Sequence, residues 1–178
     1  MATVFGNFDI SDFWEPSVYA KREYIDVPLT DELVESVERE LGYTLPKAYV
    51  ELMKHQNGGL PKKTFHRTSE RTSWSDDHIA ITGIFAIGNK KPNSLCFEGN
   101  FENLIEEWGY PPIGVYFADC PSAGHDMVCL DYRKCGPHGE PQVVHVDQEI
   151  DYKITFVANN FESFIRGLEA EDAFHDNA

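Results

Sequence analysis

The chain has 178 residues, which is enough for one domain of ordinary size and too few for two. Hydrophobic residues make up 42% of it and aromatic residues 13%, so a packed core can form and disorder is excluded as the dominant state. Thirty acidic residues face fifteen Lys and Arg, and the net charge of -15 repels nucleic acid and anionic lipid. We therefore expect neither nucleic acid nor a membrane as a partner.

The acidic residues are unevenly distributed along the chain. Residues 41–95 carry a net charge of +4, whereas residues 96–131 contain seven acids and no Lys or Arg. Such a run is typical of a solvated surface, and it also suits a surface that binds a basic protein. If this surface binds a partner, we expect the contacts to come from Glu102, Glu106, Glu107, Asp119 and Asp126.

The sequence shows no targeting signal and no membrane span. The first residues lack a basic region followed by an apolar one, and no apolar run approaches the roughly twenty residues that a spanning helix needs. The four cysteines have no C-x-x-C spacing, and a chain of this size does not need disulfides to fold. We therefore predict reduced thiols and a cytoplasmic protein.

The first half of the chain predicts two helices. Thr30 is a good N-cap, and an apolar residue at every fourth position then marks one buried face until Gly42 ends the helix. Pro46 suits the first turn of a second helix, which the Asn57-Gly58-Gly59 sequence ends. Before both helices, the aromatic and acidic residues 1–24 predict an arm that packs on the domain.

The second half predicts a sheet followed by a helix. Residues 60–78 are polar and predict a loop anchored by Trp74. Residues 78–87 predict a strand that Gly83 could bend. A short helix over 101–108 and a last helix from about Asn159 flank the remaining strands. Short, turn-rich connections favour antiparallel neighbours among these strands. We expect them over residues 113–118, 127–132, 142–147 and 152–157.

This order of elements indicates an α+β fold in which helices pack mostly on one face of a largely antiparallel sheet. We expect one domain over residues 25–168, with the arm before it and an acidic tail over residues 169–178. Trp108, at the end of its helix, is expected to face the core, and Asp131 is placed to form an ion pair with Arg133.

One group of cysteines and histidines is dense enough to raise the question of a metal. Its spacings do not match the closely paired ligands of structural zinc sites, so we expect no metal and no cofactor, and a metal protein remains an alternative. One member lies between two apolar strand residues and is expected to be a buried apolar side chain. The group consists of Cys120, His125, Cys129, Cys135 and His138.

His125 and Asp126 lie next to each other in a predicted turn and could act as an acid–base pair. No nucleophile motif accompanies them, and a turn in which Gly124 supplies a positive φ explains the same residues. We therefore expect no catalytic residues and no enzyme, with a His125/Asp126 hydrolase as the lesser alternative.

The ordered motifs of the chain resemble those of a known family. The first half contains Leu41-Gly42-Tyr43-x-Leu45-Pro46-x-x-Tyr49, followed by Asn57-Gly58-Gly59. The second half contains Gly124-His125-Asp126-x-x-x-Leu130-Asp131-Tyr132 and the terminal Ala158-x-x-Phe161-x-x-Phe164. Together they resemble the SUKH superfamily of Smi/Knr-type proteins over roughly residues 25–168.

The resemblance implies an α+β fold with a mixed, mainly antiparallel sheet and flanking helices. It implies a non-catalytic protein, because the family has no catalytic residues to carry over. Many bacterial members resemble immunity proteins that bind a polymorphic toxin, often a nuclease, and fungal relatives coordinate cell-wall assembly.

These observations lead to one main expectation and one alternative. The main expectation is an immunity protein, a monomer or weak dimer, that neutralises a basic, nuclease-type toxin by covering it with an acidic surface. The alternative is a cytoplasmic regulatory scaffold of the kind that coordinates cell-wall assembly.

Overall fold

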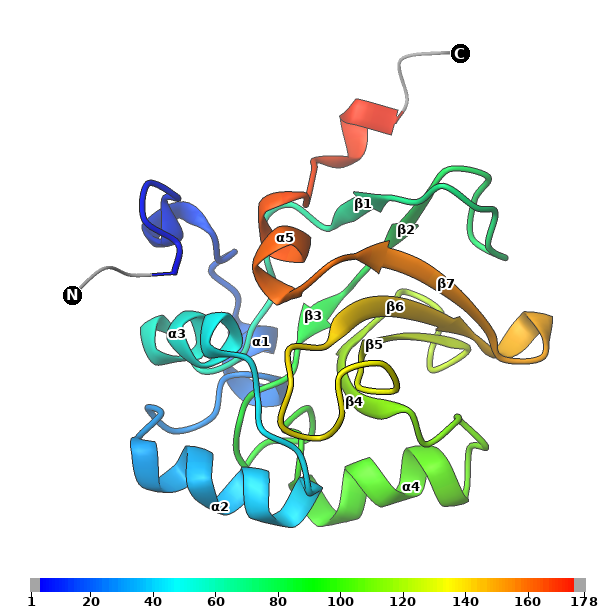
Figure 1. The fold of residues 1–178 in the computed structure, drawn as a ribbon. Coiled ribbons are helices and arrows are strands. Elements are labelled where there is room, and N and C mark those ends of the chain that lie inside the picture. Colours follow the sequence, from blue (N-terminus) through cyan, green and yellow to red (C-terminus); the bar gives the residue numbers. More distant parts are fainter. Residues whose placement is uncertain (1–3, 175–178) are drawn as a thin grey trace.

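The computed structural model describes residues 4–174, which form five α-helices and two antiparallel sheets (Figure 1). The helices are α1 (Val18–Glu23), α2 (Asp31–Leu41), α3 (Lys47–His55), α4 (Asn100–Glu106) and α5 (Phe161–Arg166). The strands are β1 (Phe65–Arg67), β2 (His78–Ala80), β3 (Gly83–Ile84), β4 (Gly114–Asp119), β5 (Asp126–Asp131), β6 (Gln142–Asp147) and β7 (Lys153–Ala158).

The centre of the fold is a five-stranded sheet in the order β3-β4-β5-β6-β7, and each of its ladders is antiparallel. Strands β1 and β2 form a separate two-stranded sheet. An isolated parallel bridge joins Ala86 to Ser94 outside the named strands. The predicted α+β class and the four long strands are confirmed, because short connections make sequential strands pair with their neighbours.

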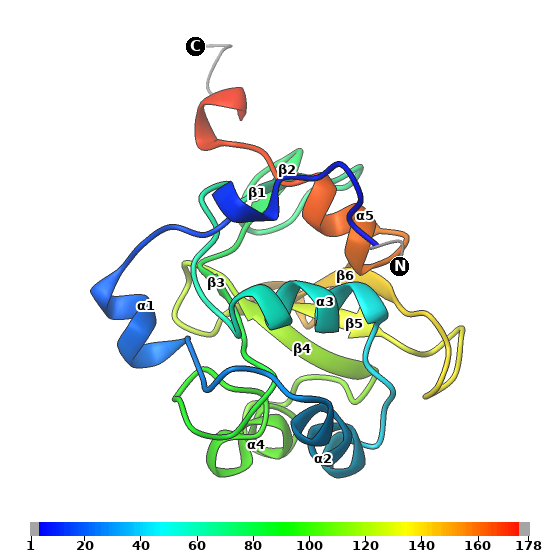
Figure 2. The ribbon, with the colours of Figure 1, turned by 90° about the vertical axis from the view of Figure 1, so that its left-hand side faces the viewer.

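Helices cover both faces of the sheet. On one face, Tyr49 of α3 and Phe161 and Phe164 of α5 surround Phe117 of β4, with ring centroids 5.3–6.0 Å from that of Phe117. Helices α2 and α4 lie together below the sheet, on its other side, in both views (Figures 1 and 2). The helices are thus distributed more evenly than the sequence predicted, because β4 and β5 are apolar on both faces and need cover on each.

The ends of α2 are set by the residues that the sequence indicated. The Thr30 hydroxyl oxygen accepts a hydrogen bond from the Leu33 amide at 3.2 Å, and Gly42 adopts a left-handed conformation with φ of 83°. Both features satisfy backbone groups that a helix end leaves unpaired. The expected start and end of this helix are confirmed.

The expected single strand over residues 78–87 is wrong in its extent. Strand β2 pairs with β1, which the sequence had placed in a loop, whereas β3 pairs with β4. The chain changes sheet at Gly83, where a Cβ atom would lie 2.3 Å from the ring of Tyr24. Trp74 does not anchor this region, because it is 42% exposed. Ser73 does so, through hydrogen bonds of 2.8 and 2.9 Å to Asp147.

The arm packs on the domain as expected, with Phe5, Phe13 and Tyr24 buried in the common core. The tail also makes contacts: the backbone of Glu169 pairs with that of Phe65 in β1. The first three residues of the arm and the last four of the tail lie outside the described residues. Among the helices of the described part, none is both long and apolar enough to cross a bilayer.

Candidate protein-binding site

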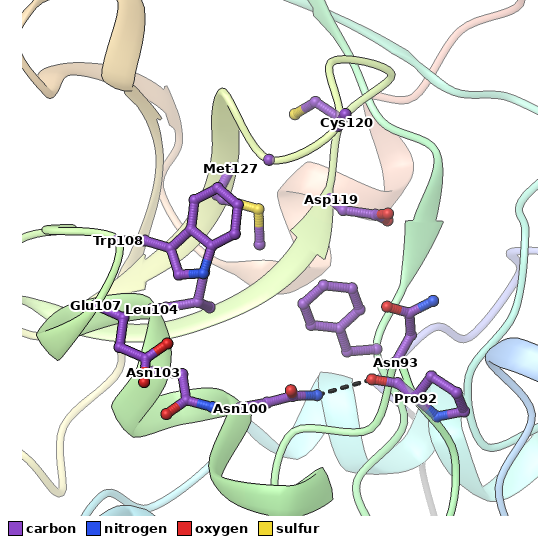
Figure 3. Close-up of a pocket in the computed structure, with 13 residues that line it drawn as sticks. Pro92, Asn93, Asn100, Asn103, Leu104, Glu107, Trp108, Asp119, Cys120 and Met127 are labelled. Atoms are coloured by element: carbon purple, nitrogen blue, oxygen red, sulfur yellow. Dashed lines mark hydrogen bonds between the residues drawn. The ribbon is translucent and has the colours of Figure 1, made fainter.

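A groove of about 340 Å³ lies between α4 and the sheet (Figure 3). Trp108 and Met127 lie on one side of it, and Asp119, at the end of β4, lies across from them. Leu104 of α4 contributes apolar surface, and the carboxylate of Glu107 lies at the rim. Asparagines contribute polar groups to the same lining, so the groove combines apolar and polar surface, as binding sites commonly do.

Trp108 is the large exposed side chain of this groove. Its side chain is 47% exposed, so the expectation that it faces the core is wrong. Gly109, with φ of 79°, turns the chain after α4 and buries Tyr110 in its place. The Tyr110 hydroxyl then donates to the Gly124 carbonyl at 2.6 Å, and the Tyr152 hydroxyl donates to the Trp108 carbonyl. These two hydrogen bonds fix the end of α4 against the sheet and hold the groove open.

Five exposed glutamates lie on α4 or close to it, and one of them, Glu107, lines the groove. Burial and the nearby carboxylates of Glu40 and Glu102 raise the pKa of the Cys96 thiol, so the end of α2 adjoins α4 at this point. Within residues 4–174, none of these glutamates forms an ion pair with Lys, Arg or His. We call them the α4 acidic surface: Glu40, Glu98, Glu102, Glu106 and Glu107.

Asp119 lines the groove, but its carboxylate already has partners. The Tyr24 hydroxyl lies 2.7 and 2.9 Å from its two oxygens, and the Gly83 amide donates at 3.1 Å. Burial raises the pKa of Asp119 to about 6, although these hydrogen bonds oppose the shift. Asp119 therefore lines the groove, but its carboxylate is bonded within the protein and is not a free surface charge.

Asp126 lies in the interior and not on the surface. It is 3% exposed, and its carboxylate accepts a hydrogen bond from Nε2 of His145 at 2.6 Å and another from the Ser122 hydroxyl. Burial opposes ionisation, but these hydrogen bonds hold the pKa of Asp126 below its ordinary value. Asp126 begins β5, and its side chain is buried on the same face of the sheet as His145 of β6, so it is not accessible to a partner protein.

Cys120 joins Asp126 and His145 in a buried cluster beneath the turn that closes the groove. One donor atom from each of the three lies within 4.8 Å of the others. No motif or spacing in the sequence had included His145 in a site. Its position between two valines in a buried strand is the signal that could have identified it, because a histidine there needs a polar partner.

The other members of the Cys/His group lie apart from this cluster. His125 is exposed and bonds to Glu149, and His138 bonds to the Thr44 hydroxyl at 2.8 Å. Cys129 is a buried core residue, as expected. All four cysteines are free. The expected Asp131–Arg133 ion pair is present at 2.7 Å.

The His125/Asp126 arrangement does not form the acid–base pair that the sequence allowed. Their side chains bond to different partners, Glu149 for His125 and His145 for Asp126. Burial raises the pKa of the Cys120 and Cys129 thiols well above the ordinary value, which keeps both thiols protonated near neutral pH.

The structure is an α+β domain with a groove between α4 and the sheet and exposed acids on and around α4. A family model described as SMI1-KNR4 cell-wall, of the SUKH group, matches residues 31–165. The chain belongs to this family, which confirms the resemblance read from its motifs. A comparison with curated proteins gave no match.

Proposed function

We propose that this chain is a non-catalytic protein-binding module that neutralises a basic partner by covering it with the α4 acidic surface. The partner class that fits best is a nuclease-type toxin, because a nuclease active site is cationic where it holds phosphate. The observation that carries the proposal is the set of exposed glutamates on and around α4 that form no ion pair within residues 4–174, together with the exposed Trp108 at the groove. Membership of the SUKH family supports it.

The charge of this face suits rapid binding to a cationic partner. Exposed charges of one sign steer a partner of the opposite sign, and the association rate then falls as salt screens the field. An aromatic side chain at the centre of an interface often contributes much of the binding free energy. Trp108 lies beside Glu107, and its backbone carbonyl accepts a hydrogen bond from Tyr152. Because this segment is already ordered, burying Trp108 in an interface costs little additional conformational entropy.

A non-catalytic role agrees with the chemistry of the candidate groups. The buried thiols are held protonated, and His125 and Asp126 point to different partners. The free cysteines support a reducing compartment, and we place the protein in the cytoplasm as a monomer or weak dimer.

The second candidate is a cytoplasmic scaffold for cell-wall assembly, and the cell-wall description of the matching family favours it. Both candidates use the same kind of surface and differ in the partner. A toxin partner is strongly basic and loses its activity when bound, whereas an assembly partner keeps its activity.

Affinity capture from the native host, followed by mass spectrometry, tests the proposal. The bait is the full chain, and the matched variant is the triple substitution Glu102→Lys, Glu106→Lys and Glu107→Lys. We expect the wild-type chain to retain a basic protein that the triple variant loses. Inhibition of that protein's nuclease activity by the wild-type chain then supports the toxin.

The control is a second triple variant with the same charge change on other exposed acids, Glu15→Lys, Asp151→Lys and Asp172→Lys. Each triple moves the net charge by six units, from -15 to -9. If both triples lose the partner equally, general charge and not the α4 acidic surface explains the binding. If neither loses it, the proposed surface is wrong.

A further inference from the structure

Three metal-ligating side chains meet in the interior, behind the turn that borders the groove. They are the thiol of Cys120, the carboxylate of Asp126 and the imidazole of His145, which are 3%, 3% and 0% exposed. Their donor atoms lie within 4.8 Å of one another. Cys120 also lines the groove, but the proposed binding of a protein partner rests on the exposed glutamates and Trp108, so the metal site can be tested independently of it.

The backbone holds these three residues in place. Asp126 begins β5 and His145 lies in the neighbouring strand β6, whereas Cys120 directly follows the end of β4. Asp126 pairs with Asp147 and Val128 pairs with His145, which makes Asp126 and His145 diagonal neighbours on one face of the sheet. Side chains that project from paired strands are positioned more precisely than those on loops.

Sulfur, nitrogen and oxygen donors together match the preferences of a borderline divalent metal such as Zn²⁺. We propose that Cys120, Asp126 and His145 form a binding site for Zn²⁺ or a transition metal of similar preference. A thiolate and a carboxylate offset the charge of the dication, and the imidazole completes three protein ligands. Three protein ligands leave the fourth position of a tetrahedral site open to another ligand.

Two polar atoms without partners give a second, independent indication. Nδ1 of His145 and the hydroxyl oxygen of Thr155 are both buried, and neither has a hydrogen-bond partner in residues 4–174. The two residues lie directly opposite each other in β6 and β7. Buried polar atoms without partners are rare in native proteins and call for an explanation. If Nε2 binds the metal, Nδ1 carries the ring proton and becomes a hydrogen-bond donor. The hydroxyl oxygen of Thr155, on the neighbouring strand, is then an acceptor available to it.

Binding requires a small local movement and the loss of protons. Two ligand atoms at the usual Zn²⁺ distances lie about 3.3 Å apart in a tetrahedron, so the 2.6 Å bond between His145 and Asp126 must open slightly. The thiol proton of Cys120 leaves to solvent, and the imidazole exchanges its proton on Nε2 for one on Nδ1, so that it stays neutral and binding releases one proton. The Ser122 hydroxyl, already bonded to Asp126, keeps that carboxylate oriented.

The test is metal binding by the full-length chain. Chelator-treated protein is titrated with Zn²⁺ by calorimetry and with Co²⁺ by absorption spectroscopy. We expect one equivalent of metal and a thiolate-to-cobalt charge-transfer band. The Cys120→Ser variant loses the band and weakens Zn²⁺ binding by about 100-fold or more, because it removes a ligand and not merely a neighbour of one.

Cys135→Ser is the matched control, since this half-buried thiol lies outside the cluster and near the exposed His138. It keeps the band and the affinity of the wild-type chain. Circular dichroism shows whether each variant is folded. A wild-type chain with no cobalt–thiolate band overturns the proposal whatever the variants do. So does a band that survives Cys120→Ser and disappears in Cys135→Ser.

Discussion

Helix α4 and the ends of strands β4 and β5 belong to the same Lys/Arg-free stretch, yet they use their acids in opposite ways. On the strands, Asp119, Asp126 and Asp131 each bond to a donor from the protein itself. On α4, Glu102, Glu106 and Glu107 are exposed and form no ion pair within the described residues. The strand carboxylates are bonded within the protein, whereas the glutamates of the α4 region remain available to a partner.

The comparison shows that one-sided composition does not by itself mark a binding surface. A buried carboxylate must have donors, because its desolvation is otherwise too costly, and strands supply these donors from neighbouring strands. A carboxylate on an exposed helix is solvated and needs none. Substitutions should therefore affect stability in the strand region and binding in the helix region.

The largest effect on stability is expected from Asp126→Ala. It leaves His145 and Ser122 without their acceptor inside the protein, which costs about 3–5 kcal/mol in free energy of unfolding. Urea denaturation at neutral pH measures it. Glu106→Ala on α4 is the control and should change the same free energy by less than about 0.5 kcal/mol. Equal losses for the two variants would remove the distinction between the regions.

The next largest effect is the pH dependence that Asp119 confers on the free energy of unfolding of the wild-type protein. Its pKa is raised to about 6 by burial, so the folded state holds a proton that the unfolded state has lost above about pH 4. Stability from this group is complete below about pH 4 and declines as pH rises through 6, by about 1–3 kcal/mol.

Asp119→Asn removes this decline and makes the melting temperature flatter between pH 4 and pH 7. Glu102→Gln, an exposed acid of α4, serves as the comparison and should leave the wild-type profile unchanged. A wild-type stability that rises steadily over this range, with no change in Asp119→Asn, would show that the carboxylate is ionised in the folded protein.

The α4 triple charge reversal should have a small effect on stability. Replacing Glu102, Glu106 and Glu107 by Lys breaks no ion pair in the described chain, so each substitution changes the free energy of unfolding by at most about 0.5 kcal/mol. Thermal melting checks this before any binding measurement. A loss of several kcal/mol would mean that these acids support the fold.

The smallest effect is expected from an exposed acid that does have a partner. Glu162 pairs with Arg166 at 2.8 Å, four residues further along α5. Glu162→Gln should cost about 0.3–0.5 kcal/mol in urea denaturation, because exposed pairs of this kind contribute little. The same substitution should leave partner binding intact, and a loss of binding would extend the partner surface beyond α4.

The sequence predicted those elements whose local signals agree with the fold. Thr30 and Gly42 bounded α2 correctly, because an N-cap side chain and a left-handed glycine act within one turn of the chain. The short connections likewise predicted the antiparallel order of β4 to β7. The sequence indicated a bend at Gly83 but not the change of sheet there, which depends on the distant ring of Tyr24.

The candidate site was predicted only in part, for the same physical reason. Glu102, Glu106 and Glu107 were correctly placed on a helix, where exposure follows from local pattern. Burial of Asp126 depends on a partner nineteen residues away, His145, which the spacing along the chain did not reveal. Exposure of Trp108 follows from the turn at Gly109 and the distant Tyr152, and no local pattern indicated it.

The most direct measurement of the central claim is the association rate with the captured partner over a series of salt concentrations. The wild-type chain should bind fast at low salt and more slowly as salt rises, because the field of the α4 acidic surface is screened. The Glu102→Lys, Glu106→Lys, Glu107→Lys variant should associate about 10-fold more slowly or worse at low salt and lose most of the salt dependence. Identical rates for the two proteins across the series would contradict the account.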